Sequence, residues 1–222
     1  MKILERSNLM KNIEVKEILC FGDSLTWGWN PVDRGRYPFE KRWTGVLQKE
    51  LGKDYRIIEE GLNGRTTIWD DPIEGEKNGK KYLIPCLESH LPLDLVIIML
   101  GTNDLKLRFN KSAFDIAAAA DSLIQLVQKS RAGRDSQSPK ALLVSPPPLG
   151  KLTDWEEMMI GGYEKSKKLA GYYEMFARDH QYFFFNAGEF VKTSDLDGLH
   201  WEEGENLKFG KAVAKKVKEI FV

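Results

Sequence analysis

A Gly-Asp-Ser tripeptide closes the first apolar run of the chain, in the stretch EILCFGDSLTWGW that spans residues 17–29. Ser24 therefore stands at the tip of a predicted strand, which is where an acyl-transfer enzyme would place a nucleophile. A serine hydroxyl is a weak nucleophile until a neighbouring base takes its proton. Catalysis by Ser24 would thus require a base, a group that orients the base, and donors for an oxyanion.

Among the three histidines, His200 is the best candidate for the base. It lies in SDLDGLHW, between the last predicted strand and the predicted C-terminal helix, and Asp197 precedes it by three residues. Residues at this spacing are neighbours in a turn, so Asp197 could accept from Nδ1 and leave Nε2 free to face Ser24. Taken alone, the segment fits equally well a turn that is capped by an aspartate. His90 and His180 directly precede strands, at the opposite end of the sheet, and we expect them to be structural or surface residues.

Donors for a tetrahedral oxyanion are available on three segments. The backbone N–H of Ser24 is one donor, and Gly64 in GLNGRTT is a second, because a residue without Cβ lets its N–H approach a ligand. Asn103, in LGTND after the third apolar run, offers a side-chain N–H. Asn-Gly is also a common turn dipeptide, and Asn103 could simply cap its loop. The catalytic interpretation is favoured because the donors follow three successive strands and the histidine follows the last.

Five short apolar runs are expected to position these segments, at residues 18–21, 55–58, 95–100, 141–144 and 182–185. Such runs are typical of strands that are buried on both faces of a parallel sheet. Helical patterns lie between them, one of which begins with a capping signature formed by Ser112 and Asp115. Alternating strands and helices predict a three-layer α/β/α sandwich. In such a sheet ligands bind beyond the carboxyl ends of the strands, where the candidate residues fall.

The composition of the chain excludes several classes of function. Among its 222 residues, 33 are basic and 33 are acidic, so we expect no nucleic-acid or membrane partner. The length fits one domain, and we predict an N-terminal extension at residues 1–15 and a single domain at residues 16–222. Cys20 and Cys86 are expected to be reduced core residues, not a disulfide or a metal site. Without a signal-like N-terminus or a long apolar run, a cytoplasmic location is predicted.

The stretches FGDSLTWG, GLNGRTT, GTND and DGLH resemble, in this order, the four sequence blocks of the SGNH, or GDSL-type, esterase/lipase superfamily. The wider context, including RWTGVL and LLVSPPPL, resembles its arylesterase/acyltransferase (perhydrolase-like) subgroup over about residues 16–220. The resemblance implies that Ser24, Gly64, Asn103 and His200 are the catalytic Ser, Gly, Asn and His of the superfamily. It also implies that Asp197 is the aspartate of the Asp-x-x-His pair.

This resemblance further implies a flavodoxin-like fold, with a five-stranded parallel sheet in the order 2-1-3-4-5, and a Ser-His-Asp esterase without metal or other cofactor. Members of the subgroup hydrolyse short-chain acyl and aryl esters, several pass the acyl group to alcohols or hydrogen peroxide, and they form homo-oligomers. We therefore expect a small-molecule ester as substrate and a homo-oligomer. The alternatives are a carbohydrate O-deacetylase or a thioesterase/lysophospholipase on the same scaffold and, from another class, a non-catalytic binding domain.

Residues that flank the catalytic segments are candidates for the substrate pocket. The predicted substrate-binding set is Asp23, Trp27, Thr102, Lys106, Trp155, Met159, Leu199 and Trp201. Lys106 has the alternative of being a solvated lysine. The segment at residues 155–164 offers Met158 and Ile160 as further lining of an acyl pocket, or it forms a helix that packs on the core.

Overall fold

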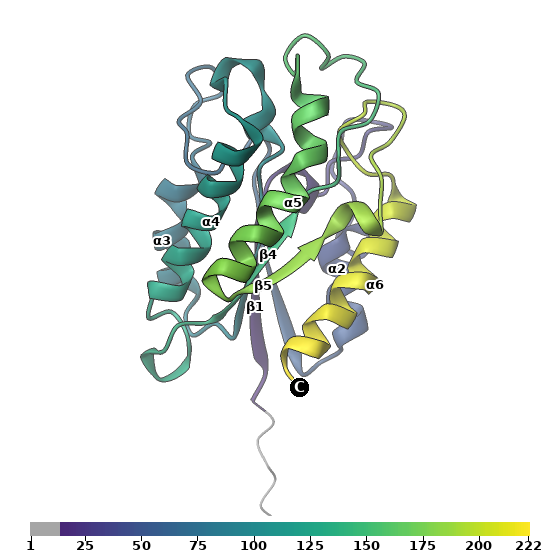
Figure 1. Cartoon of the computed structure of the whole chain (residues 1–222). Helices are drawn as coiled ribbons and strands as arrows, with labels where there is room; N and C mark the ends of the chain where they lie inside the picture. Colours follow the sequence, from purple (N-terminus) through teal and green to yellow (C-terminus); the bar gives the residue numbers. More distant parts are fainter. Residues whose placement is uncertain (1–13) are drawn as a thin grey trace, which may run out of the picture.

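A computed structural model of the chain describes residues 14–222 and arranges them in three layers, with a sheet between two groups of helices (Figure 1). The sheet has five parallel strands in the order β2-β1-β3-β4-β5. The strands are β1 (Lys16–Gly22), β2 (Tyr55–Gly61), β3 (Leu95–Met99), β4 (Lys140–Ser145) and β5 (Phe183–Asn186). The predicted fold class and strand order are confirmed. Of the predicted extension at residues 1–15, only Glu14 and Val15 belong to the described residues.

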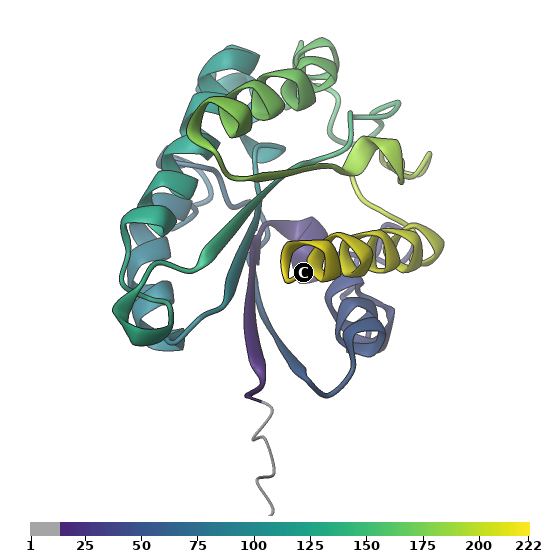
Figure 2. The same ribbon diagram turned by 60° about the horizontal axis from the view of Figure 1, so that its bottom comes forward.

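Six α-helices lie in residues 14–222 and cover both faces of the sheet. They are α1 (Ser24–Trp27), α2 (Trp43–Leu51), α3 (Gly79–His90), α4 (Ala113–Lys129), α5 (Gly162–His180) and α6 (Glu203–Ile220). The predicted capping box is present at the start of α4, where Ser112 and Asp115 each accept a hydrogen bond from the other's backbone N–H. Figure 2 shows α3, α4 and α5 on one side of the sheet, and α2 and α6 on the other.

Two hydrophobic cores result from the alternation of side chains along the strands. In β1, Leu19 and Phe21 pack into the core under α3, α4 and α5, whereas Ile18 and Cys20 pack into the core under α2 and α6. All five residues of β3 are buried, as expected for a strand that is covered on both faces. Residues of β2 are only half-buried or exposed, contrary to the expectation, because β2 is an edge strand with a neighbour on one side only.

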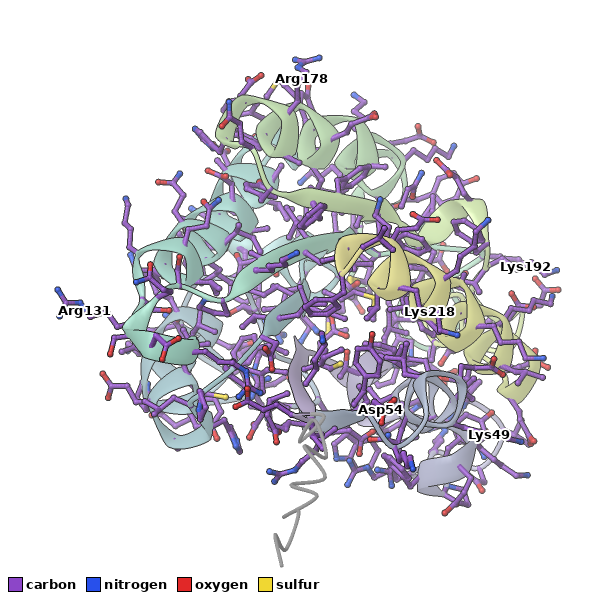
Figure 3. The ribbon with its side chains drawn as sticks, turned by 90° about the horizontal axis from the view of Figure 1, so that it is seen from below. Lys49, Asp54, Arg131, Arg178, Lys192 and Lys218 are labelled. Carbon is purple, nitrogen blue, oxygen red and sulfur yellow. The ribbon has the colours of Figure 1, made fainter. Side chains whose placement is uncertain are left out.

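The loops that carry the candidate residues gather at the carboxyl ends of the strands, at the upper end of Figure 1. Figure 3 is a view from the opposite end, in which the charged side chains of Arg131, Arg178 and Lys192 point away from the body of the molecule. Cys20 and Cys86 are buried free thiols, as predicted. None of the helices in residues 14–222 combines the length and the apolar character that crossing a membrane requires.

Two glycines in long helices differ in the space around them, which makes the packing of α6 on α2 testable. A Cβ on Gly210 of α6 would lie 2.6 Å from Val46 Cβ and 2.7 Å from the carbonyl oxygen of Trp43. We predict that Gly210→Ala lowers the free energy of unfolding by about 1–3 kcal/mol, as overpacking does. Gly171→Ala in α5 should raise it by roughly 0.5–1 kcal/mol, because no described atom lies within 4 Å of the added Cβ. Urea unfolding measures the free energy of unfolding of each variant. If both substitutions changed it in the same direction, the packing described for α6 would be contradicted.

Candidate active site

A chain of hydrogen bonds joins Asp197, His200 and Ser24 at the carboxyl end of the sheet. His200 Nδ1 lies 2.7 Å from Asp197 Oδ2, and His200 Nε2 lies 2.9 Å from Ser24 Oγ. All three residues are buried, although Ser24 and His200 are 176 positions apart in the sequence. The structure thus brings together the three residues that the sequence analysis selected as nucleophile, base and orienting group.

The turn at residues 197–200 holds the carboxylate of Asp197 in place. Its Oδ1 accepts the backbone N–H groups of Leu199 at 2.8 Å and His200 at 2.9 Å, which leaves Oδ2 for the imidazole. Burial by itself would raise the pKa of Asp197, but the hydrogen bonds and the nearby imidazole lower it below its usual value. Asp197 is therefore ionised at neutral pH. Because a carboxylate only accepts hydrogen bonds, His200 donates from Nδ1 to Asp197, and in the neutral imidazole Nε2 is then the acceptor that faces Ser24 Oγ.

Asp23 places Ser24 at the start of the short helix α1. As the N-cap residue, its Oδ1 accepts the backbone N–H of Leu25 at 3.0 Å, and its side chain is buried behind the nucleophile. The first N–H groups of a helix have no partner within the helix. The N–H of Ser24 is therefore available to a ligand next to its own hydroxyl.

Gly64 lies in a tight turn after β2. The turn is closed by a hydrogen bond of 3.0 Å from the N–H of Arg65 to the carbonyl of Leu62. At the third position Gly64 has a φ of +80°, which is the value that type II turns require and that side chains disfavour. The glycine is thus needed for the backbone conformation, and it borders the same cavity as Ser24.

Asn103 opens a short turn after β3. Its side-chain Nδ2 donates to the carbonyl of Arg65 at 3.2 Å and to Asp23 Oδ2 at 3.5 Å, so a ligand oxygen at Asn103 would replace the longer of two hydrogen bonds. The next residue, Asp104, accepts the backbone N–H of Thr67 at 3.0 Å. These bonds tie the loop after β3 to the loop after β2 and fix the two candidate oxyanion donors relative to each other.

The candidate residues border a cavity of about 150 Å³. This volume is below the roughly 300–1,000 Å³ of pockets for drug-sized ligands, so the cavity suits a small ligand. The cavity is lined by Ser24, Trp29, Asn63, Gly64, Glu74, Asn103, Lys106, Trp155, Met158, Leu199 and His200. The lining combines an aromatic and aliphatic set, Trp29, Trp155, Met158 and Leu199, with a larger set of polar residues.

A sequence profile described as the GDSL-like lipase/acylhydrolase family matches residues 20–206. The chain belongs to this family. Members of this family are carboxylic ester hydrolases, and the predicted family and esterase class are confirmed at this level.

Several solved structures of GDSL-type esterases are similar to the chain. A carbohydrate acetylesterase from Sinorhizobium meliloti is 47% identical, with a TM-score of 0.90 over 92% of this chain and 99% of that chain. An aryl esterase from M. smegmatis is 46% identical, with a TM-score of 0.88 over the same shares of the two chains. A second carbohydrate acetylesterase family member from S. meliloti is 37% identical, with a TM-score of 0.88 over 93% of this chain and 99% of that chain. The comparison with curated proteins found no match.

In this GDSL-type chain, three of the predicted substrate-binding residues line the cavity, namely Lys106, Trp155 and Leu199. Met158 lines it as well, whereas the side chain of Ile160 is about half exposed and takes no part. Lys106 is 3% exposed and ion-paired with Glu74, so it is not a solvated lysine. The segment before α5 forms turns instead of a helix, and for this reason it can direct adjacent side chains to different places.

The other predicted substrate-binding residues, Asp23, Trp27, Thr102, Met159 and Trp201, lie outside this lining. Asp23 and Thr102 are buried beneath the site. Met159 and Trp201 are each 1% exposed and belong to the two cores. Consecutive residues of a turn point in different directions, so Met158 faces the cavity while Met159 faces the core.

Trp29 takes the place in the cavity that was expected for Trp27. Its ring stacks on the imidazole of His200, with the ring centroids 5.2 Å apart, whereas Trp27 lies under the guanidinium of Arg36. Gly28, with a φ of +90°, ends α1 between the two tryptophans and turns the chain back toward the site. The motif contains both tryptophans, but the sequence does not predict the direction in which either side chain points.

Asn63 and Glu74 also line the cavity and were not predicted. The signal for Asn63 was its place beside Gly64 in a segment that had already been selected. Glu74 stands in the polar loop at residues 70–78, where the only signal was the length of the loop. Nothing in the local sequence of that loop indicates that it folds back over Ser24.

One group in the described residues could hold a metal ion, although no metal site was predicted. The ligand atoms of Glu60, Cys86 and His90 lie within 4.8 Å of one another, and the last two are one turn apart on α3. Burial and then the charge of Glu60 raise the pKa of the Cys86 thiol to about 12, so it is protonated at neutral pH. His90 Nε2 lies 2.9 Å from Glu60, and the positive charge of Arg65 acts on both Glu60 and Cys86 and opposes a second cation. We assign this group a structural contact between β2 and α3.

Buried carboxyl groups beneath the site make stability depend on pH. Burial raises the pKa of Asp23 to about 7, with the amide of Leu25 lowering it and the charge of Asp104 raising it. An aspartate in the unfolded chain titrates at about 3.9. Between these values the folded state binds more protons than the unfolded state, so this group makes the protein less stable as the pH rises from about 4 to about 7.

We predict that Asp23→Asn, which keeps a helix-capping side chain, removes this contribution. The free energy of unfolding of the variant, minus that of the wild type, should become more positive between pH 4 and pH 7 in urea unfolding. The exposed Asp179→Asn is the matched control for the loss of one carboxylate. A difference for Asp23→Asn that does not change with pH would contradict the argument.

Proposed function

We propose that this protein is a serine esterase that cleaves short-chain acyl esters through an acyl-enzyme. The observation that carries the proposal is the unbroken chain of hydrogen bonds from Asp197 through His200 to Ser24, of 2.7 and 2.9 Å, at the wall of a small cavity. His200 Nε2 takes the proton of Ser24 while Oγ attacks the ester carbonyl carbon. The proton then passes from His200 to the oxygen of the leaving alcohol as its bond to the carbonyl carbon breaks, and the acyl group stays on Ser24.

Negative charge develops on the carbonyl oxygen in this step and needs hydrogen-bond donors. We assign this role to the backbone N–H groups of Ser24 and Gly64 and to the side-chain N–H of Asn103, because all three residues line the cavity. Each donor of this kind contributes about 3–4 kcal/mol to the stability of the transition state. Asp197 remains ionised and stabilises the positively charged imidazole of His200.

The second step releases the acyl group to an acceptor. His200 takes a proton from water, the resulting oxygen nucleophile attacks the acyl carbon, and Ser24 leaves with the proton that His200 returns. An alcohol in the place of water yields a new ester, and hydrogen peroxide yields a peracid. The apolar side of the cavity, formed by Trp29, Trp155, Met158 and Leu199, supports transfer to such acceptors because it limits the water near the acyl-enzyme.

A carbohydrate O-deacetylase is the second candidate function. It is favoured by the polar side of the cavity, with Asn63, Glu74 and Lys106, and by the 47% identical carbohydrate acetylesterase from S. meliloti. The homo-oligomer, the cytoplasmic location and the single domain at residues 16–222 stay predictions.

Ser24→Ala should abolish the reaction while leaving the fold intact. We predict that kcat for p-nitrophenyl acetate falls by about 10⁴-fold or more, as for other serine nucleophiles, and that labelling by a fluorophosphonate is lost. Asn103→Ala should lower kcat by about 10²–10³-fold. Ser138→Ala, at an exposed serine outside the cavity, is the matched control. Wild-type turnover by the Ser24 variant would refute the mechanism, and wild-type protein that cannot be labelled would favour a binding domain.

Acyl transfer predicts a common acyl-enzyme for water and alcohol. With 1-butanol present during hydrolysis of p-nitrophenyl acetate, butyl acetate should form while the rate of acetate formation falls. Trp155→Ala, which opens the apolar wall, should lower the ratio of butyl acetate to acetate in assays by gas chromatography. If acetate forms at an unchanged rate without butyl acetate, the transfer activity is refuted and the hydrolase remains.

A further inference from the structure

Glu74 projects from the loop at residues 70–78 into the catalytic cavity. The carboxylate of Asp71 anchors this loop, because its Oδ1 accepts the backbone N–H groups of Ile73 at 2.9 Å and Glu74 at 3.0 Å. Arg108 donates to the other oxygen of Asp71 at 2.7 Å, and the Asp71 side chain is completely buried. The loop therefore fixes the backbone of Glu74, and the position of Glu74 at the cavity is built into the fold.

The two carboxylate oxygens of Glu74 have different surroundings. Oε1 binds the ammonium group of Lys106 and the guanidinium of Arg108. Oε2 accepts no hydrogen bond from residues 14–222 and lies against Gly64, where it is 2.3 Å from the position that a Cβ would take. About a third of the side chain is exposed, so Oε2 is an open acceptor beside a proposed oxyanion donor.

A second acceptor without a partner is buried next to the same cavity. The side-chain oxygen of Asn63 is buried and, among the described residues, has no hydrogen-bond partner. Asn63 precedes Gly64 in the tight turn and lines the cavity together with Glu74. A buried acceptor without a partner costs free energy, so a ligand that donates hydrogen bonds here gains more than it would at the surface.

The charges around Glu74 restrict the kind of donor. Lys106 and Arg108 pair with Asp71 and Glu74, so the formal charge of this ion-pair network is zero. Lys77, whose Cε lies 3.4 Å from the position of a Cβ on Gly64, adds one positive charge beside Oε2. An anionic ligand would meet the open oxygen of Glu74, and an ammonium group would meet Lys106, which is only 3% exposed. Neutral hydroxyl groups suffer neither repulsion. They are therefore the donors that fit this part of the cavity.

We infer that Glu74 and Asn63 form a subsite for hydroxyl groups on the alcohol part of the ester, which makes the enzyme selective for acyl esters of neutral polyols such as glycerol or a sugar. This inference rests on the proposed function and deepens it. The short acyl chain has no donors and belongs on the apolar side, near Trp29 and Met158. The polyol then extends over Gly64 toward the two acceptors, and Glu74 is a specificity-determining residue.

The test compares kcat/KM for acetate esters that share the acyl group and differ in the alcohol. The panel is glycerol monoacetate, propyl acetate, the anion O-acetylglycolate and the cation acetylcholine. The wild type should prefer glycerol monoacetate to propyl acetate by about tenfold or more, since hydrogen bonds to charged groups are strong. Glu74→Gln should lower this ratio by about tenfold and raise the ratio of O-acetylglycolate to propyl acetate. Asn63→Ala should lower the ratio of glycerol monoacetate to propyl acetate without raising the ratio of O-acetylglycolate to propyl acetate.

Glu76→Gln is the matched control, because it removes the same charge from the same loop at an exposed residue outside the cavity. It should leave both ratios unchanged. A wild type without preference for glycerol monoacetate would overturn the inference even if no variant folded, and so would a Glu74→Gln protein with unchanged ratios. Failure of the proposed function would be seen separately, as wild-type turnover of p-nitrophenyl acetate by Ser24→Ala.

Discussion

The candidate active site depends on one constraint, which is that the paired strands β1, β2 and β3 end at the same height in the sheet. Gly22 at the end of β1 pairs with Gly61 of β2 on one side and Met99 of β3 on the other. The nucleophile follows its strand by two residues, Gly64 by three and Asn103 by four. A strand rises about 3.3 Å per residue, so a slip of one residue would move a donor by more than a hydrogen bond tolerates. The backbone ladder of the sheet therefore sets the geometry that the chemistry requires.

Polar groups beneath the site then convert this coarse alignment into fixed positions. Asp23 caps the helix of the nucleophile, Asp104 holds the loop of Thr67, and Arg65 donates to the carbonyl of Gly22 at 2.9 Å. Two of these groups are buried carboxyls, and burial raises the pKa of Asp23 to about 7 and of Asp104 to about 6. Their burial costs stability at neutral pH, which is the usual cost of preorganising a site. Asp197, which accepts from His200, differs from these two groups because its hydrogen bonds and the nearby imidazole outweigh the effect of burial and lower its pKa.

Reaction and selectivity reside in different parts of the fold. The nucleophile candidate Ser24 and the donor candidates Gly64 and Asn103 lie within four residues of strand ends, whereas Asp197 and His200 share a turn just before α6. The chemical character of the cavity comes from loops, with Trp155 and Met158 before α5 and Glu74 from residues 70–78. Loops tolerate change because they contribute little to the core. Related GDSL-type enzymes can therefore keep one mechanism while the loops alter which alcohol or acyl group the cavity accepts.

The sequence by itself determined the strands and their layers, because these depend on local patterns, and it selected the candidate catalytic residues from ordered motifs that follow predicted strands. Apolar runs mark the strands, and the spacing of Asp197 and His200 within one turn places base and orienting group together. Only the tertiary structure decided that Trp29 and not Trp27 covers the imidazole, and that Glu74 enters the cavity. The direction of a loop side chain is set by partners far along the chain, as Lys106 and Arg108 are for Glu74, and such contacts leave no periodic signal in the sequence.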